Sequence, residues 1–125
     1  MTMKLNHLNL PVENVAVTRH FFEQYFGFKC IDIKGDDLLS VLIGTDGFTL
    51  VLMANSFNRH ENAAYPDALH IGFFVATREE VIALYERLKT SDITLAQEPS
   101  NMRGVFGFYF HAPGNILTEV STALN

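Results

Sequence analysis

Tyr-Phe-His-Ala-Pro-Gly-Asn-Ile-Leu-Thr-Glu-Val-Ser, residues 109–121, is the stretch around which the chain is organised. It ends in an apolar β-run that carries one carboxylate, Glu119, in its middle. A carboxylate that faces a β-core costs several kcal/mol unless it is paired, hydrogen-bonded or bound to a cation. Two histidines in other apolar runs, His7 and His70, are the best candidates for partners of Glu119.

The composition limits both the fold and the partners. A chain of 125 residues with 48% hydrophobic and 18% charged residues predicts one globular domain, residues 1–125. The net charge of -5, without a basic stripe, argues against nucleic acid as a partner. The apolar runs are strand-sized and the first residues lack a signal-peptide pattern, so we expect no membrane association. The single Cys30 fits a reducing compartment, and we expect a cytoplasmic protein.

Periodicity in the first half predicts a strand, a helix and three further strands. Residues 5–12 alternate so that His7 and Asn9 share one face of a strand. Asn14 is a plausible N-cap and Gly27 a plausible C-cap for the helix between them. The expected elements are strands over residues 5–12, 28–34, 38–43 and 48–53 and a helix over 15–26.

The second half repeats this pattern after a polar segment. Residues 54–66, which include Glu61 and Asn62, are expected to form a linker or flap. Thr77 caps the second helix, and Glu80 completes a capping box. The expected elements are strands over 68–75, 93–97, 105–111 and 116–121 and a helix over 78–90. The sequence therefore predicts two βαβββ modules, residues 1–55 and 67–125.

The repeat can be tested by laying one half on the other. His7 falls on His70 when the two first strands are superimposed. The run from Gly47 to Ala54 falls on the run from Gly114 to Ser121, which places Glu119 on Leu52. The second module then has a polar pair where the first has only its histidine.

Two histidines and one carboxylate on three strands match the ligands of a facially coordinated divalent metal with open positions. We expect His7, His70 and Glu119 to be inward-facing by alternation and to bind this metal, as Fe, Mn, Ni, Co or Zn. Each residue also has an ordinary reading: His7 as a surface residue, His70 as a hydrogen-bonded core histidine and Glu119 as a solvated carboxylate. We favour the metal site because the two histidines are equivalent in the repeat.

The motifs resemble the vicinal oxygen chelate superfamily, also called the glyoxalase, bleomycin-resistance and dioxygenase family. The resemblance spans most of the chain and rests on four segments. They are Leu-Asn-His-Leu-Asn-Leu-Pro-Val at 5–12, Phe-Phe-Glu-Gln-Tyr-Phe-Gly-Phe at 21–28, Leu-His-Ile-Gly-Phe at 69–73 and Phe-Tyr-Phe-His-Ala-Pro-Gly-Asn at 108–115, followed by Glu119. It implies an α+β fold in which two βαβββ modules form a curved mixed sheet around a metal cleft. It also implies a homodimer.

The branches of this family differ in their ligands. Members with four ligands, such as glyoxalases, carry Glu or Gln where this chain has Leu52. Dioxygenases have a further catalytic His where this chain has residues 101–103, and fosfomycin-resistance thiol transferases have a potassium loop that residues 101–107 do not match. We therefore expect a metal-dependent dioxygenase, lyase or thiol transferase that acts on a small molecule, rather than a true glyoxalase.

Further residues receive roles around this expected site. The resemblance implies that Tyr109 is a hydrogen-bond donor at the cleft, although it also reads as one more strand aromatic. Asn9 shares the face of His7 and is placed to contact a metal-bound oxygen, so Tyr109 and Asn9 are the candidate catalytic residues. Arg103 is a candidate for binding an anionic substrate, or a solvated loop charge. His111 is expected at a turn, without a role.

Two readings from other functional classes remain open. The first is a metal-free protein of the bleomycin-resistance type, which would bind an aromatic drug or metabolite in an acidic, aromatic-lined cleft. The second is a structural or interaction protein with a vestigial site.

Overall fold

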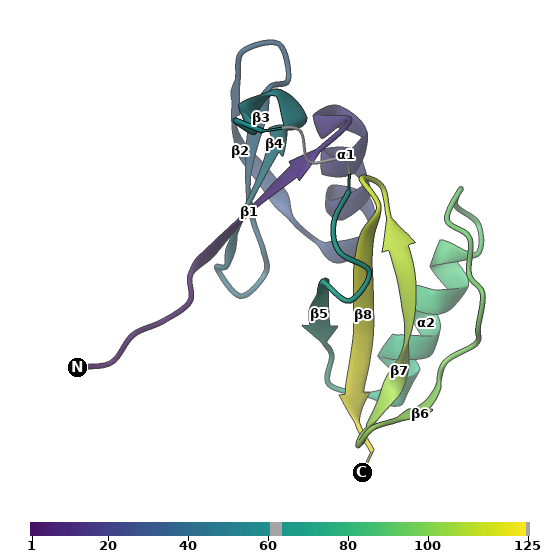
Figure 1. Cartoon of the computed structure of the whole chain (residues 1–125). Coiled ribbons are helices and arrows are strands. Elements are labelled where there is room, and N and C mark those ends of the chain that lie inside the picture. Colours follow the sequence, from purple (N-terminus) through teal and green to yellow (C-terminus); the bar gives the residue numbers. More distant parts are fainter. Residues whose placement is uncertain (61–63, 125) are drawn as a thin grey trace. The chain divides into compact units, whose positions relative to one another are not determined.

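The computed structural model describes residues 1–60 and 64–124, and the chain forms two compact units, Met1–Ala63 and Ala64–Asn125. Each unit holds a mixed four-stranded sheet and one longer α-helix (Figure 1). This is the α+β fold of two βαβββ modules that the repeat predicted.

Unit 1 has the strand order β1-β4-β3-β2, in which β1 and β4 are parallel and the other pairs antiparallel. Its elements are β1 (His7–Val12), α1 (Val15–Phe26), β2 (Lys29–Lys34), β3 (Leu39–Ile43), β4 (Thr49–Ala54) and the short 3-10 helix η1 (Asn55–Phe57). η1 lies in the expected flap, whereas Glu61 and Asn62 of that segment lie outside the described residues.

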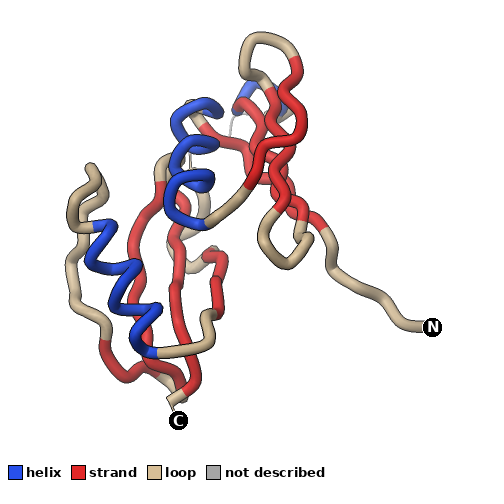
Figure 2. The backbone as a smooth tube through the Cα atoms, turned by 180° about the vertical axis from the view of Figure 1, so that it is seen from behind, coloured by secondary structure: helices blue, strands red, loops and turns tan. Residues whose placement is uncertain are grey.

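Helix α1 begins and ends where its caps predicted. The Asn14 side chain accepts a hydrogen bond from the Val17 backbone N–H at 3.0 Å, and Gly27 ends the helix in the left-handed region at φ 69°. The buried side chains Phe21 and Phe22 lie on this helix, which packs on strands β2, β3 and β4 (Figure 2). The aromatic side chains that recur at helical spacing thus lie in the core of unit 1.

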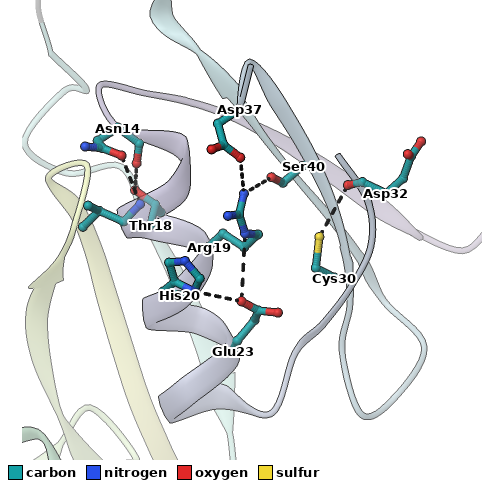
Figure 3. Close-up of polar contacts among 10 residues, drawn as sticks. Asn14, Thr18, Arg19, His20, Glu23, Cys30, Asp32, Asp37 and Ser40 are labelled. Carbon is teal, nitrogen blue, oxygen red and sulfur yellow. Dashed lines mark hydrogen bonds and ion pairs between the residues drawn. The ribbon is translucent and has the colours of Figure 1, made fainter. Parts of the chain in front are cut away.

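A buried arginine ties α1 to the β2–β3 turn (Figure 3). Arg19 donates from Nη1 to Asp37 Oδ1 at 2.8 Å and to Ser40 Oγ at 2.9 Å. Its Nε lies 4.0 Å from Glu23 Oε1. Because its charge is hydrogen-bonded and paired, this arginine can be buried at the edge of the core.

Unit 2 has the strand order β5-β8-β7-β6, with β5 and β8 parallel, so its topology repeats that of unit 1. Its elements are β5 (His70–Phe74), α2 (Arg78–Leu88), β6 (Ser100–Met102), β7 (Val105–Ala112) and β8 (Ile116–Ala123). Thr77 Oγ1 caps α2 by accepting from the Glu80 N–H at 3.1 Å. The Glu80 carboxylate accepts from the Ala76 N–H, one residue before the expected capping-box position.

The strand expected over residues 93–97 was wrong. These residues alternate in burial, but the strand that pairs with β7 is β6, Ser100–Met102. The tight Arg103–Gly104 turn joins β6 to β7 and sets their register from Met102 opposite Val105. The alternation of apolar and polar residues over 93–97 therefore predicted a strand in a segment that does not join the sheet.

Each sheet has one face against its helix and one face opposite. Side chains on the helix side form the core, and in unit 2 they include Phe108, Phe110, Ile116 and Val120. We call the opposite side of each sheet its open face. No helix among the described residues is long and apolar enough to cross a membrane.

Candidate functional site

Three of the predicted site residues meet on the open face of unit 2. Tyr109 on β7 pairs directly with Glu119 on β8, and Gly72 on β5 pairs with Glu119 from the other side. His70 lies two residues before Gly72 and therefore on the same face. Three strands thus bring a histidine, a carboxylate and a phenol together.

His70 is oriented for ligand binding by a backbone hydrogen bond. Its Nδ1 lies 3.1 Å from the Ala68 carbonyl oxygen, which can only accept, so Nδ1 carries the proton. In the neutral imidazole Nε2 then presents a lone pair, and this nitrogen lies 3.8 Å from Glu119 Oε1. Two ligand atoms with bonds of about 2.1 Å to one metal lie roughly 3–3.5 Å apart, so this pair is close to a ligand geometry.

Tyr109 supports the same pair. Its hydroxyl donates a hydrogen bond to Glu119, and its ring lies edge-on to His70 with centroids 5.6 Å apart. The hydrogen bond to Glu119 raises the pKa of Tyr109 above its ordinary value, and burial adds to the rise. The Arg103 guanidinium opposes this rise in the pKa of Tyr109. Tyr109 is therefore a hydrogen-bond donor that keeps its proton near neutral pH.

Glu119 is not buried in an apolar core, as its place in the sequence suggested. Its side chain is 19% exposed and that of His70 is 42% exposed, because both lie on the open face. The neighbours Thr118 and Val120 point to the helix side and are buried. The inward position expected for the candidate ligands is thus the face of the sheet away from the helix.

His7 and Asn9 lie on the open face of unit 1. Both are exposed on β1, opposite to the buried Leu10, so the alternation predicted their side correctly. His7 Nδ1 lies 2.8 Å from Asn6 Oδ1. Donation from Nδ1 to that oxygen leaves Nε2 as the free ligand atom, as in His70.

The pairing of the first strand of each module, β1 and β5, shows that Leu52 was the wrong residue to match with Glu119. His7 pairs with Thr49 and His70 with Leu117, so the residue of unit 1 that matches Glu119 is Val51. Leu52 points to the helix side and is completely buried. The expected register was off by one residue because the turns before β4 and β8 differ in length. The conclusion that unit 1 offers no carboxylate there is unchanged.

The remaining charged candidates lie at the margins or elsewhere. Arg103 is exposed in the β6–β7 turn and has a positive φ of 26°. His20 is on the surface of α1, with Nδ1 3.4 Å from Glu23 Oε1. His111 does not lie at a turn, as expected, but within β7, exposed on the same face as Tyr109.

The donor atoms in unit 2 are compatible with metal binding. Over the described parts of the chain, neither unit groups three or more His, Cys, Asp or Glu side chains that could hold a metal ion. The fit rests on the imidazole of His70 and the carboxylate of Glu119 in unit 2, whose donor atoms suit divalent Fe, Mn, Co, Ni or Zn.

The sequence did not predict the groups that orient the two histidines, nor the glycine that leaves space beside Glu119. Asn6 precedes His7 directly, and an amide at that position was the available signal. The Ala68 carbonyl carries no side-chain signal at all. Among the described residues, and apart from its two chain neighbours, a Cβ added at Gly72 would meet no atom within 4 Å, so there is room for a side chain at this position beside Glu119.

Comparisons with known proteins agree with the fold. Residues 4–120 match the family model described as Glyoxalase/Bleomycin resistance protein/Dioxygenase superfamily. A structure described as a possible glyoxalase from Bacillus cereus is 34% identical, with a TM-score of 0.82 over 96% of this chain and 99% of that one. Lactoylglutathione lyase from Agrobacterium tumefaciens shares the fold, with 16% identity and a TM-score of 0.75 over 97% and 94%.

Proposed function

The chain belongs to the Glyoxalase/Bleomycin resistance protein/Dioxygenase superfamily, and from this premise we propose that it is a divalent-metal-dependent enzyme. Its substrate is a small molecule with two neighbouring oxygens. The proposed metal ligands are His7, His70 and Glu119, and the reaction is of the dioxygenase, lyase or thiol-transferase kind rather than that of a glyoxalase.

One observation carries this proposal: His70 Nε2 lies 3.8 Å from Glu119 Oε1 on an accessible sheet face, while Nδ1 lies 3.1 Å from the Ala68 carbonyl oxygen. A histidine whose other nitrogen is held by a carbonyl is typical of metal ligands. His7 has the equivalent strand position and an equivalent orienting partner, Asn6. We therefore propose that it joins the pair as the third ligand.

The chain's own groups have separate tasks around the ligands. A divalent metal held there supplies a Lewis acid that polarises substrate oxygens. Tyr109 fixes the orientation of Glu119 through its hydrogen bond. Asn9, on the face of His7, offers an amide to a substrate oxygen. Arg103, whose charge lowers the pKa of Tyr109, attracts an anionic part of the substrate.

The proposed site has three protein ligands to the metal, whereas glyoxalases have four. The Bacillus cereus relative is described as a possible glyoxalase, which makes this activity the one to test against. The family's four-ligand members place a second carboxylate or amide in the first module, and this chain has Val51 at the position that matches Glu119. An apolar side chain there cannot ligate a metal or shuttle a proton.

Elemental analysis tests the proposal. Protein purified without a chelator should contain a divalent metal, and the His70→Ala variant should not, while the surface variant His20→Ala should keep it. Equal metal content in the His70→Ala variant and the natural protein would overturn the metal site. A metal-loaded screen of diols, thiol adducts of 2-oxoaldehydes, and fosfomycin then identifies the reaction.

We further propose that the protein is a cytoplasmic homodimer, and complementation can locate its site. If His7 of one subunit joins His70 and Glu119 of the other, mixing refolded His7→Ala and Glu119→Ala chains creates heterodimers with one intact site. Metal binding is then recovered in part. If the three ligands come from one chain, every site in the mixture lacks a ligand and nothing is recovered.

A second candidate function is a metal-free binder of an aromatic drug or metabolite. The observation in its favour is the exposed aromatic surface of the open face in unit 2, where Phe74 is 67% and Tyr109 38% exposed. Such rings can stack on a planar or cationic ligand. Binding of bleomycin that persists in EDTA would favour this function over the enzyme.

A further inference from the structure

The residues before β1 form an extended arm with one apolar side. Residues 1–5 precede β1 and extend away from the sheet of unit 1 in both views (Figures 1 and 2). Met1, Met3 and Leu5 are each 80% or more exposed. In an extended backbone these three side chains lie on one side, and Thr2 and Lys4 lie on the other. The arm therefore has the side-chain pattern of a strand with one apolar face.

Strand β2 offers an edge that suits such a strand. It is the last strand in the order β1-β4-β3-β2, so among the described residues of unit 1 no strand pairs with its outer edge. Ile31 and Ile33 on this strand are both exposed. Ile33 pairs with the buried Ser40 and lies on the helix side, whereas Asp32 pairs with Val41 and lies on the open face. An exposed apolar edge strand is a template for pairing with another chain.

A bulge limits how far this edge is regular. Between Cys30 and Asp32 the register against β3 shifts, which leaves Asp32–Lys34 as the regular part of the edge. Bulges and charged side chains on an edge strand limit uncontrolled pairing. The β2 edge therefore suits a short partner strand of matching charge rather than a long sheet.

The arm and the β2 edge are complementary in charge and in apolar side chains. When Lys4 is placed opposite Asp32, the two apolar residues that flank the lysine fall beside Ile31 and Ile33, in either strand direction. Lys4 and Asp32 are both exposed. The opposite charges then share the open face, and Ile33 meets an apolar residue of the arm on the helix side.

The arm is too short to reach this edge within its own unit. β1 and β2 lie at opposite ends of the strand order, so a strand beyond β2 would lie four strand spacings from β1, or roughly 19 Å. The five residues of the arm span at most about 18 Å when fully extended. They start from a fixed point, because the Thr49 N–H donates to the Asn6 carbonyl oxygen at 3.0 Å. Crossing the sheet would use the whole arm, so an arm that pairs with β2 comes from a second copy.

We propose that residues 1–5 of one subunit pair with the β2 edge of a second copy, with Lys4 opposite Asp32, and that the two copies exchange their arms reciprocally. A reciprocal exchange uses the same surfaces on both copies and closes as a dimer. It goes beyond the proposed function, because it gives the homodimer an interface that needs no metal. Since the arm continues into β1, the exchange also anchors the strand that carries His7.

A charge exchange tests the pairing of Lys4 with Asp32. Sedimentation equilibrium of the full chain in EDTA measures the dissociation constant of the dimer. Lys4→Glu and Asp32→Lys should each raise this constant about 10-fold, because an attractive cross-strand pair becomes repulsive in both arms. The double variant restores the attraction and should dimerise like the natural protein. Lys89→Glu, which changes an exposed lysine at the end of α2, is the charge control and should have no effect.

A second set of variants tests the apolar contact. Leu5→Ser and Ile33→Ser should each raise the dissociation constant on the order of 10-fold or more, because apolar surface is no longer buried between the copies. Ile82→Ser on α2 is the matched control, since Ile33 and Ile82 are 47% and 45% exposed, and it should leave the constant unchanged. Ile33→Thr repeats the measurement with a β-branched residue should Ile33→Ser fold poorly.

Other outcomes separate the arm exchange from the proposals above. If the double variant stayed as weak as its single variants, or if Lys4→Glu and Ile33→Ser dimerised like the natural protein, the arm exchange would be overturned and the homodimer would rest on another surface. If the natural protein were a monomer at all concentrations, the homodimer and the exchange would both fall. The metal site is judged separately, by the metal content of the His70→Ala variant.

Discussion

The two units have the same topology but different chemistry on their open faces. Across the central strands, unit 1 aligns Asn9, Val51 and Val41, whereas unit 2 aligns Gly72, Glu119 and Tyr109 at the matching positions. One face is mostly apolar at this level, and the other combines a carboxylate, a phenol and a missing side chain. The fold is repeated, but the candidate site is concentrated in one copy.

The difference teaches that the scaffold does not depend on the residues of the open face. The core of each unit lies on the helix side, where both modules use apolar residues such as Leu52 and Val120. Side chains on the opposite face contribute little to that core, so they can vary from valine to glutamate without changing the sheet. Function can thus differ between two copies that fold by the same rules.

The largest expected effect comes from placing a glutamate at Leu52 in unit 1, and a glutamate at the neighbouring Val51 is the matched control. Leu52→Glu buries a charge against α1 at a fully buried position and should cost on the order of 5 kcal/mol, close to the whole stability of a small domain. Val51→Glu places the same residue on the open face and should change the free energy of unfolding by less than about 1 kcal/mol. Urea unfolding followed by circular dichroism measures both.

This pair also tests the register and the ligand count. Val51→Glu would give unit 1 the pair of His and Glu that unit 2 has, so we expect tighter Zn²⁺ binding and a gain of glyoxalase-type isomerisation. If Leu52→Glu folded well and Val51→Glu did not, the match of Val51 to Glu119 would be wrong.

The next effect is on metal binding. Glu119→Val copies the residue of unit 1 into unit 2 and removes one of the proposed ligands. We expect the affinity for Zn²⁺ to fall on the order of 100-fold or more, because even the loss of groups that only support a ligand costs about 10–100-fold. The unfolding midpoint of the metal-free protein should barely move. Calorimetric titration with Zn²⁺ compares it with Val41→Ala, which should bind the metal normally.

The sequence predicted most of the fold because its signals were local. The caps Asn14, Gly27 and Thr77 and the period of the apolar residues act within a few residues. The sheet register depends on turn length and long-range pairing, which is why Leu52 was taken for Val51 and strand β6 was misplaced. His70 and Glu119 could be predicted as neighbours from alternation and the repeat, whereas Tyr109 was placed beside them by the family resemblance. Their contacts with the Ala68 carbonyl and with one another required the structure.

A smaller effect concerns the two arginines that anchor the helices. Arg19 in unit 1 is buried and bonded to Asp37 and Ser40, whereas Arg78 in unit 2 bonds to Asn101 at 3.1 Å at an exposed site and lies 4.4 Å from the Phe106 ring. Arg19→Ala should cost about 1–3 kcal/mol, since buried partners lose a charged hydrogen bond. Arg78→Ala should cost less than about 1 kcal/mol. Equal losses in urea unfolding would contradict this difference between the units.

The smallest effect contrasts the hairpin turns of the two units. The β2–β3 turn places Gly35 and Asp37 at positive φ, which such residues tolerate, whereas the β6–β7 turn places Arg103 at φ 26° before Gly104. Asn before Gly is the favoured choice for this turn, so Arg103→Asn should raise the free energy of unfolding by about 0.5–1 kcal/mol. An arginine kept at such a position is expected to serve binding.

If Arg103 serves binding, the Arg103→Asn variant should lose affinity for the substrate while it gains stability. Arg103→Asn removes the charge that opposes the rise in the pKa of Tyr109, so that pKa should move further up in an ultraviolet titration of the phenol. Affinity for an anionic substrate should fall in Arg103→Asn and be largely kept in Arg103→Lys, which retains the charge and the strained turn. If Arg103→Asn gained stability and bound that substrate as well as the natural protein, the arginine would be a solvated turn residue and the site of unit 2 would end at Tyr109.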